Sequence, residues 1–372
     1  MHLPLPLSTL GTLTLTLALS LALLLPTSIA QTTTPRTTSQ TKFQYRTNGT
    51  WLENLALGPA RGVATTPTLL VTRMDVPELW SLDVSTGRGE IVASFPNATA
   101  CMGITPLGRE GVYAVVVGRL RITDIGHPVV GSWGVYSVTF PGGVAGEDGD
   151  GDGGDDGGGV SVRKIADVPE AGWLNGMARF PSGGTGIQAR GGEKAGVVLI
   201  ADSVNGVIWQ LDTQTGTYRV ALNDTASMAA SPTDPLGLGV NGVRVWRGFV
   251  YYSTDSVQAV FRVPVRWDNS SQTVTAAGAV ETVAANVVVD DFAVAEDGGL
   301  YLMAVAENQV VRVTAAGERS VLAGTRESAQ VAGCTSGVIS RDGRRLFVTT
   351  NGGHITPPKG GEEPAKLVEI DL

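Results

Sequence analysis

Four oxygen-bearing side chains recur at one point of a repeated sequence unit. They are Glu53, Asn175, Asn241 and Asp291, and each stands at the start of a short apolar segment. Two carboxylates and two carboxamides form an all-oxygen ligand set of the kind that Ca²⁺ prefers, with water or a substrate oxygen completing six or seven ligands. If the units surround an axis, these side chains converge on it. The pattern therefore predicts a Ca²⁺ site, in which the ion is either structural or a Lewis acid.

A purely structural interpretation explains each of these residues alone. Asn-Gly pairs at 175–176 and 241–242 favour tight turns, because both residue types tolerate positive φ. Glu53 and Asp291 would then be ordinary surface acids. This interpretation does not explain why a polar residue recurs at the same place in the unit, so the metal hypothesis is the stronger of the two.

The elements that must position these residues are short β-strands. Each unit has three or four apolar strands separated by turns, some with Asp-Gly as at 297–298 and 342–343. Six units follow one another, at 53–82, 101–138, 174–212, 240–263, 291–313 and 334–370. No long amphipathic helix separates the strands, which excludes a parallel α/β sheet. The sequence therefore predicts an all-β, six-bladed β-propeller.

The sixth unit ends with three strands at Leu372. A fourth strand would come from the segment around Phe43 and Tyr45, so we predict a ring closed by an N-terminal strand. Residues 42–372 would form this single domain, after a flexible leader at 31–41. Because the first strand of each blade leaves the mouth of the channel and the second returns to it, the loops after the second strands should surround the predicted metal site.

Charge and composition exclude several classes of function. The formal net charge of −8 argues against a nucleic-acid partner, which requires a basic surface. With 49 Gly and 17% charged residues, the chain is neither a disordered polyampholyte nor a helical bundle. It contains no G-x-S-x-G, no H-E-x-x-H and no phosphate loop, which disfavours serine-hydrolase, zinc-protease and nucleotide or flavin chemistry.

Residues 1–30 are typical of a signal peptide. An apolar run at 10–25 precedes Pro26 and the small residues before Gln31. An uncleaved membrane anchor is the alternative, although the run is short and rich in Thr and Ser, and no later segment could span a bilayer. Four N-x-S/T triplets lie between apolar runs, with their asparagines at Asn48, Asn97, Asn223 and Asn269. Together these features predict a glycoprotein of the secretory pathway or the extracellular space.

Two further features of the sequence predict no functional site. Cys101 and Cys334 stand at equivalent points of blades two and six, which are not neighbours, so we predict that they form no disulfide. The Gly/Asp-rich segment at 146–159 imitates the start of an EF-hand loop. It lacks the bidentate Glu at its end and the flanking helices, so we predict a disordered surface loop.

The residues at the start of the units resemble those of gluconolactonase-like propellers, relatives of senescence marker protein, over about residues 45–372. The resemblance implies that Glu53, Asn175, Asn241 and Asp291 hold a divalent metal, usually Ca²⁺. The stretches Trp51-Leu52-Glu53-Asn54-Leu55, Trp173-Leu174-Asn175-Gly176-Met177 and Gly239-Val240-Asn241-Gly242 look more like a secreted fungal branch. Some members of that branch are hetero-Diels–Alderases of tropolonic sesquiterpenoid pathways.

The resemblance implies a small hydrophobic substrate pair, a quinone methide and a humulene-type alkene. A pericyclase needs a pocket that holds both reactants and a donor that polarises a carbonyl. The expected catalytic residues are Arg73, Arg119 and His354. The expected substrate-binding residues are Trp51, Met102, Trp173, Phe292, Asp202 and Asp255. For each charged residue of the rim, a solvated loop charge is the alternative.

Two other functions stay open from the sequence. A Ca²⁺-assisted lactonase or esterase would use the metal to polarise an ester carbonyl and a carboxylate or His to activate water. A non-catalytic propeller would use the mouth to recognise a ligand or a partner. The likeness to the hetero-Diels–Alderases favours the pericyclase.

Overall fold

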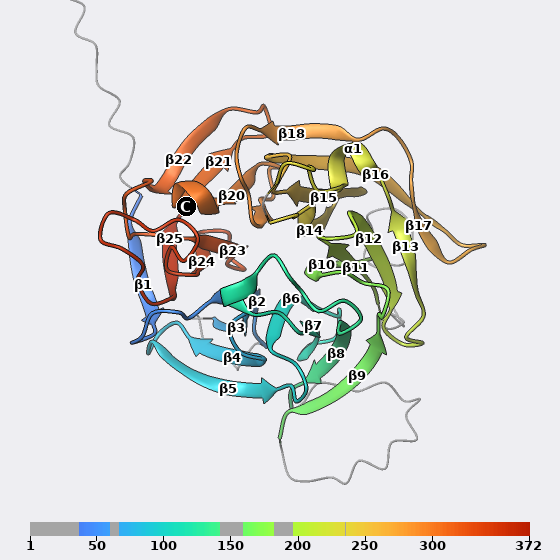
Figure 1. Cartoon of the computed structure of the whole chain (residues 1–372), viewed down its shortest axis with the longest axis horizontal. Helices are drawn as coiled ribbons and strands as arrows, with labels where there is room; N and C mark the ends of the chain where they lie inside the picture. Colours follow the sequence, from blue (N-terminus) through green and yellow to red (C-terminus); the bar gives the residue numbers. More distant parts are fainter. Residues whose placement is uncertain (1–36, 60–66, 142–158, 182–195, 235) are drawn as a thin grey trace, which may run out of the picture. The chain divides into compact units, whose positions relative to one another are not determined.

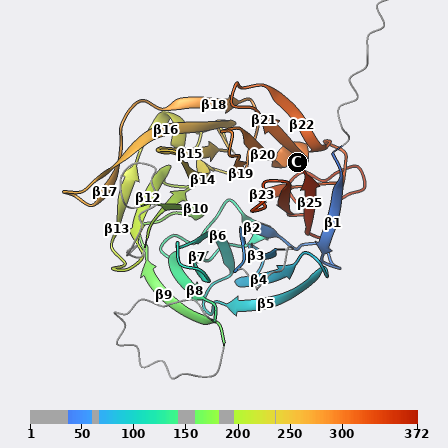
Figure 2. The same cartoon turned by 180° about the vertical axis from the view of Figure 1, so that it is seen from behind.

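Six antiparallel sheets are arranged radially around one channel in the computed structural model (Figures 1 and 2). The structure describes residues 37–59, 67–141, 159–181, 196–234 and 236–372. The only α-helix among them is the single turn α1 (Thr225–Met228). The prediction of an all-β, six-bladed β-propeller is confirmed.

Each of the first three blades has four strands, numbered outward from the channel. They are β2 (Leu52–Leu57), β3 (Thr68–Arg73), β4 (Glu78–Asp83) and β5 (Arg88–Ser94) in blade one; β6 (Ala100–Pro106), β7 (Val112–Gly118), β8 (Gly134–Thr139) and β9 (Ser161–Asp167) in blade two; and β10 (Leu174–Phe180), β11 (Val197–Asp202), β12 (Val207–Asp212) and β13 (Tyr218–Leu222) in blade three.

Blades four to six follow the same plan. They consist of β14 (Val240–Trp246), β15 (Phe249–Thr254), β16 (Ala259–Asp268), β17 (Thr273–Ala276) and β18 (Glu281–Ala285) in blade four; β19 (Phe292–Val294), β20 (Leu300–Ala304), β21 (Gln309–Val313) and β22 (Arg319–Gly324) in blade five; and β23 (Cys334–Ile339), β24 (Arg345–Thr350) and β25 (Lys366–Asp371) in blade six. Both β17 and β18 pair with β16.

The sixth blade is completed by β1 (Ser39–Gln44), which pairs antiparallel with β25. The predicted closure of the ring by an N-terminal strand is therefore confirmed. The strand begins at Ser39, three residues before the predicted start of the propeller at residue 42. The predicted signal peptide at 1–30 and nearly all of the Gly/Asp segment lie outside the described residues.

The core lies between neighbouring blades. The second strand of each blade is covered on both faces, so it can be apolar at successive positions, as in the fully buried Val197–Asp202. Apolar clusters fill the spaces between adjacent sheets. Cys101 and Cys334 are buried and unbonded, as predicted. No helix in the described part of the chain is long and apolar enough to cross a membrane.

A bulge at the start of the innermost strand sets the direction of the functional side chains. In blade three, Leu174 pairs with Asp202 and Met177 pairs with Ile200, so two residues oppose one between these pairs. Four other blades show the same register shift. In blade five, Asp290 and Asp291 together oppose Met303 through backbone hydrogen bonds. A bulge changes the directions in which its two unpaired side chains point. In these blades, the two side chains of each bulge lie in two separate layers of the channel.

Candidate functional site

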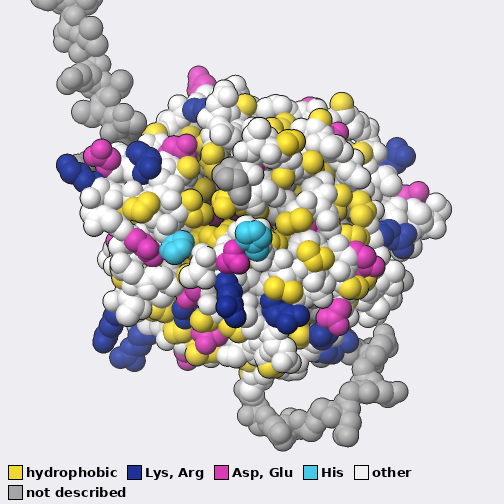
Figure 3. All heavy atoms as spheres, in the orientation of Figure 1, with side chains coloured by type: hydrophobic (Ala, Val, Ile, Leu, Met, Phe, Trp, Pro, Cys, Tyr) yellow, Lys and Arg dark blue, Asp and Glu magenta, His cyan; other side chains and the backbone are white. Residues whose placement is uncertain are grey.

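A cavity of about 300 Å³ opens at one end of the channel. Figure 3 shows this end, where hydrophobic side chains gather around the centre and both described histidines lie nearby. The loops after the second strands of five blades contribute lining residues, as the strand directions predicted. These residues are Met74, Ile125, Asp255, Ser256, Gln258, Val305, Ala306, Ile355 and Thr356. The connection between blades three and four adds Ser231, Thr233, Asp234, Leu236 and Leu238.

The first bulge residues form the floor of the cavity. Glu53, Asn175 and Asn241 line it as the repeat implied, but the residue from blade five is Asp290, not Asp291. The cavity-facing residue stands two positions before the first paired apolar residue of each strand. Phe292 is that apolar residue in blade five, and aligning the units on it would have identified Asp290 from the sequence.

Asp291 belongs to the layer beneath the floor, with the second bulge residues. Its Oδ2 accepts hydrogen bonds from Asn54 Nδ2 (3.2 Å), Ser336 Oγ (2.6 Å) and Arg244 (2.5 Å). This carboxylate is compensated by a guanidinium and lies away from the cavity. It therefore holds blades one, four, five and six together and is replaced by Asp290 in the candidate ligand set.

The floor is strongly acidic. Burial, together with the nearby charges of Asp291 and Asp255, raises the pKa of Glu53 to about 8, against the lowering effect of the hydrogen bond from Trp51 Nε1. Burial also raises the pKa of Asp255 and Asp290, and the two carboxylates repel each other. With Asp234, four carboxylates line the cavity, and its described lining includes no Lys or Arg. The floor therefore lacks a positive charge that would compensate its acids.

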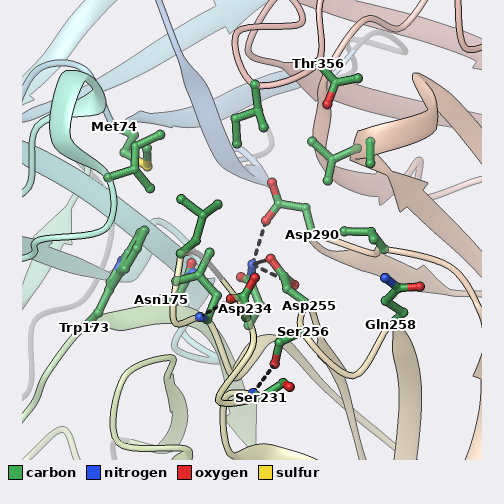
Figure 4. A pocket seen from close by; sticks show the side chains of 18 of the residues that line it. Met74, Trp173, Asn175, Ser231, Asp234, Asp255, Ser256, Gln258, Asp290 and Thr356 are labelled. Carbon is green, nitrogen blue, oxygen red and sulfur yellow. Dashed lines mark hydrogen bonds between the residues drawn. The ribbon is translucent and has the colours of Figure 1, made fainter.

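The amide of Asn241 connects two of these carboxylates. Its Nδ2 donates to Asp290 Oδ1 at 2.9 Å and to Asp255 Oδ2 at 3.1 Å. Figure 4 shows the side chains of Asp255 and Asp290 close together in the pocket. The nitrogen is fully engaged, which leaves the Asn241 oxygen for another partner. Asn175 donates through Nδ2 to Ser203 Oγ at 3.2 Å, while its buried Oδ1 has no hydrogen-bond partner.

These donors fit a hard divalent cation. The buried Oδ1 of Asn175 lacks a hydrogen-bond partner. Oε2 of Glu53 accepts a hydrogen bond from Trp51 Nε1 at 2.7 Å, which leaves Oε1 of Glu53 for a ligand. An all-oxygen set with excess negative charge is the chemistry that Ca²⁺ prefers. Among the described residues, no three His, Cys, Asp or Glu side chains cluster closely enough to bind a metal by themselves. Such an ion would therefore need the two asparagines as ligands.

The two arginines predicted as carbonyl-polarising donors lie elsewhere. Arg73 pairs with Asp75 and Glu78 and stacks over the Tyr45 ring at 4.5 Å. Arg119 is exposed on the loop after β7. Neither lines the cavity. The structure thus does not bring the two predicted carbonyl-polarising donors to the cavity, and a local acid or solvent satisfies each guanidinium.

Three predicted substrate-binding residues are part of the framework. Met102 and Phe292 are completely buried in the core between blades. Asp202 is also fully buried, and it accepts hydrogen bonds from the backbone of Gly172 and Trp173 and from Trp209 Nε1. None of the three lines the cavity. Asp202 instead holds the backbone just before β10, and this positions Trp173.

The other predicted residues lie at the cavity or next to it. Trp51, Trp173 and Asp255 line it. His354 lies behind Trp51, with ring centroids 5.7 Å apart, and its Nδ1 is 3.2 Å from Glu362 Oε1. His354 therefore contacts a wall residue and does not itself line the cavity. Sequence reasoning missed three acids and amides of the lining. Asp234 and Gln258 lie on loops, and Asp290 belongs to the bulge of blade five.

The four asparagines of the predicted glycosylation sites are all exposed, in connections between strands. Asn48 donates through Nδ2 to the backbone oxygen of Glu362 at 2.9 Å. The structure thus leaves each site accessible.

Comparison with known proteins supports the resemblance seen in the sequence. No family model matches the chain. The chain is 23% identical over 325 residues to a protein of Phoma sp. described as a "Putative hetero-Diels-Alderase", covering 82% of this chain and 84% of that one. Regucalcin of Agrobacterium tumefaciens, a calcium-binding protein, superposes with a TM-score of 0.51 at 16% identity, over 89% of this chain and 94% of its own. A "putative gluconolactonase" superposes with a TM-score of 0.53 at 14% identity, over 90% and 92%. The solved structures establish the likeness of fold.

Proposed function

We propose that this chain, which has the fold of the gluconolactonase-like six-bladed propellers, is a hetero-Diels–Alderase that binds Ca²⁺ at the floor of its mouth cavity. The observation that carries the proposal is a cavity with apolar walls above an oxygen-rich floor, in a chain similar to a described hetero-Diels–Alderase over most of its length. The proposed reactants are a quinone methide and a humulene-type alkene.

The walls supply what a cycloaddition needs from a protein. The apolar part of the lining consists largely of Trp51, Met74, Trp173, Leu236, Leu238 and Val305. Two apolar reactants held between such walls meet in a near-attack arrangement, which lowers the entropic part of the barrier. No bond to the protein is required. The O=C–C=C unit of the quinone methide and the C=C bond of the alkene lose three π bonds and gain one C=C π bond, one C–O σ bond and one C–C σ bond, so all atoms of both reactants remain in the adduct.

The floor would provide electrostatic stabilisation of the reacting carbonyl group. A bound Ca²⁺ would polarise the carbonyl oxygen of the heterodiene as a Lewis acid. Glu53, Asn175, Asn241 and Asp290 would hold the ion, and Asp255 would hold the Asn241 amide in place. Trp51 orients Glu53 through its indole N–H. Cavity hydroxyls such as Ser231, Ser256 and Thr356 could orient polar substituents of the reactants.

A Ca²⁺-assisted lactonase is the second candidate. It is favoured by the acidic floor, where Asp255 lies beside the proposed ion and could accept a proton from water. His354 is less suited to this role, because it packs against Trp51 and does not line the cavity.

The decisive experiment follows both reactions with one protein preparation. The purified chain is incubated with Ca²⁺ and either the quinone-methide precursor plus humulene or a panel of aliphatic lactones. We expect an adduct whose mass is the sum of the two reactants, formed faster and with higher stereoselectivity than without protein. Acid release from a lactone, with no acceleration of the adduct, would instead favour the lactonase. Asn175→Ala should abolish either activity, and Arg119→Ala should preserve it.

We also propose that the protein enters the secretory pathway. Its mature form should begin near Gln31 and shrink on deglycosylation, because all four glycan acceptors are exposed. N-terminal sequencing and an electrophoretic shift after glycosidase treatment measure both properties. A product that retains residues 1–30 and carries no glycan would contradict the proposal.

A further inference from the structure

Exposed aliphatic side chains are concentrated at one end of the propeller. Of the ten large hydrophobic residues that are exposed among those described, five lie on loops at the cavity mouth. We call these five the apolar rim: Val129, Val130, Val204, Val257 and Ile355, exposed by 45%, 64%, 42%, 37% and 46%. Four others lie on the outermost strands, and the last is the C-terminal Leu372. None of the ten lies on the described loops at the opposite end of the channel.

The position of the rim residues follows from their neighbours, and Val129 and Val130 share the blade-two loop with Ile125, which lines the cavity. Val257 stands between Ser256 and Gln258, which both line the cavity, and Ile355 lines it directly. Val204 follows Asp202, whose carboxylate holds the backbone of Trp173. The rim residues thus come from four different blades and surround one opening. Scattered surface valines need no explanation, but five around one mouth form a patch that water solvates poorly.

Basic side chains stand beside the rim. Arg119 and Arg121 are exposed on the blade-two loop, where Val129 N donates to Arg119 O at 2.9 Å. On the blade-six side, Lys359 is exposed near Ile355, and Arg326 reaches Pro357 O at 3.3 Å. Two acids of these loops are engaged by histidines, as Asp124 is by His127 and Glu362 is by His354.

We infer that the cavity mouth docks on a phospholipid surface. Aliphatic loop tips with adjacent Arg and Lys match the acyl boundary and the phosphate groups of a bilayer. A protein partner would instead be expected to meet exposed aromatic anchors, and no Trp, Tyr or Phe is among the exposed large hydrophobic residues described. The acidic floor is recessed below the rim, so it does not oppose this contact. A lipophilic ligand could then pass from the bilayer into the cavity without crossing water.

The test compares two pairs of valines with similar exposure. Val129→Asp with Val130→Asp changes the mouth, and Val220→Asp with Val321→Asp places the same charges on outermost strands β13 and β22. The full chain and both double variants are sedimented with phosphatidylcholine vesicles containing phosphatidylserine. We expect the mouth variant to lose about tenfold or more of its partition coefficient, while the outer variant matches the unchanged protein.

A site-specific probe separates rim insertion from binding by the apolar run at 10–25. Both native cysteines are buried, so an environment-sensitive fluorophore on Val130→Cys reports mainly that position. Its emission should shift to the blue with vesicles, while the same label on Val220→Cys should not respond. A silent probe at residue 130, equal losses in the two double variants, or self-association without vesicle binding would overturn the inference. These measurements need no substrate, so the proposed reaction can fail while docking holds, or the reverse.

Discussion

Adjacent aspartates in blade five have different roles because they occupy the two positions of one bulge. Asp290 faces the cavity, and Asp291 pairs with Arg244 in the layer below. Replacing Asp290 by Asn should therefore reduce the stabilisation that Ca²⁺ confers by linkage. Replacing Asp291 by Asn should lower stability by about 3 kcal/mol with or without Ca²⁺, since it leaves a largely buried guanidinium unpaired. Thermal melts of both variants, in Ca²⁺ and in chelator, measure the difference. Equal Ca²⁺ responses would contradict the assignment of Asp290.

The raised pKa of Glu53 predicts how stability depends on pH. The folded pKa of about 8 exceeds the ordinary value of 4.5, so the folded chain binds a proton more tightly than the unfolded chain. The stability linked to this group is complete below pH 4.5 and is lost as the pH rises toward 8. Asp255 and Asp290 shift in the same direction. In chelator, the melting temperature should therefore fall across this range, and Ca²⁺ should flatten the curve. A melting temperature that rises across the range in chelator would refute this prediction.

At the scale of the element, the bulge of blade four requires a glycine, because the inner strands of blades four and five approach each other closely there. A Cβ added at Gly242 would lie 2.9 Å from the Cα of Asp291. The second strand supports the same bulge, since Gly242 N donates to Ser253 Oγ at 2.8 Å. We expect Gly242→Ala to destabilise the fold by about 2 kcal/mol through overpacking. Gly126→Ala, with nothing within 4 Å of the added Cβ, is the matched control and should be nearly neutral. Urea unfolding of both variants tests this, and comparable midpoints would show that the strands can separate.

At the scale of the whole molecule, the ring depends on a strand from the far end of the sequence. β1 completes blade six, and Tyr45 continues the contact through a backbone hydrogen bond to Ala365 at 3.1 Å. A chain that starts at residue 46 should lose cooperative unfolding or melt at a much lower temperature, because β25 becomes an open edge. A chain that starts at residue 37 keeps β1 and should melt like the full protein. Calorimetry of both would settle the role of β1, and similar melting curves would argue against closure as a stabilising device.

The sequence by itself determined the architecture and much of the floor. Alternating apolar segments, Asp-Gly turns and six recurring units define blades, because strand and turn preferences are local. The same periodicity placed Glu53, Asn175 and Asn241 at one level of the channel. It also identified the loops around the mouth, since successive antiparallel strands reverse direction.

Only the tertiary structure decided which side chains reach the cavity. A displacement of one residue changes the face on which a strand side chain lies, and this alone separates Asp290 from Asp291. Arg73 and Asp202 carry chemistry that could serve catalysis, yet nearby acids engage the first and backbone amides and an indole engage the second. The acids that engage Arg73 are close to it in the sequence, whereas the Gly172 and Trp173 amides reach Asp202 only when the chain has folded. Residue type and spacing therefore predicted most of the cavity floor. Packing determined which of the other charged side chains can reach a ligand in the cavity.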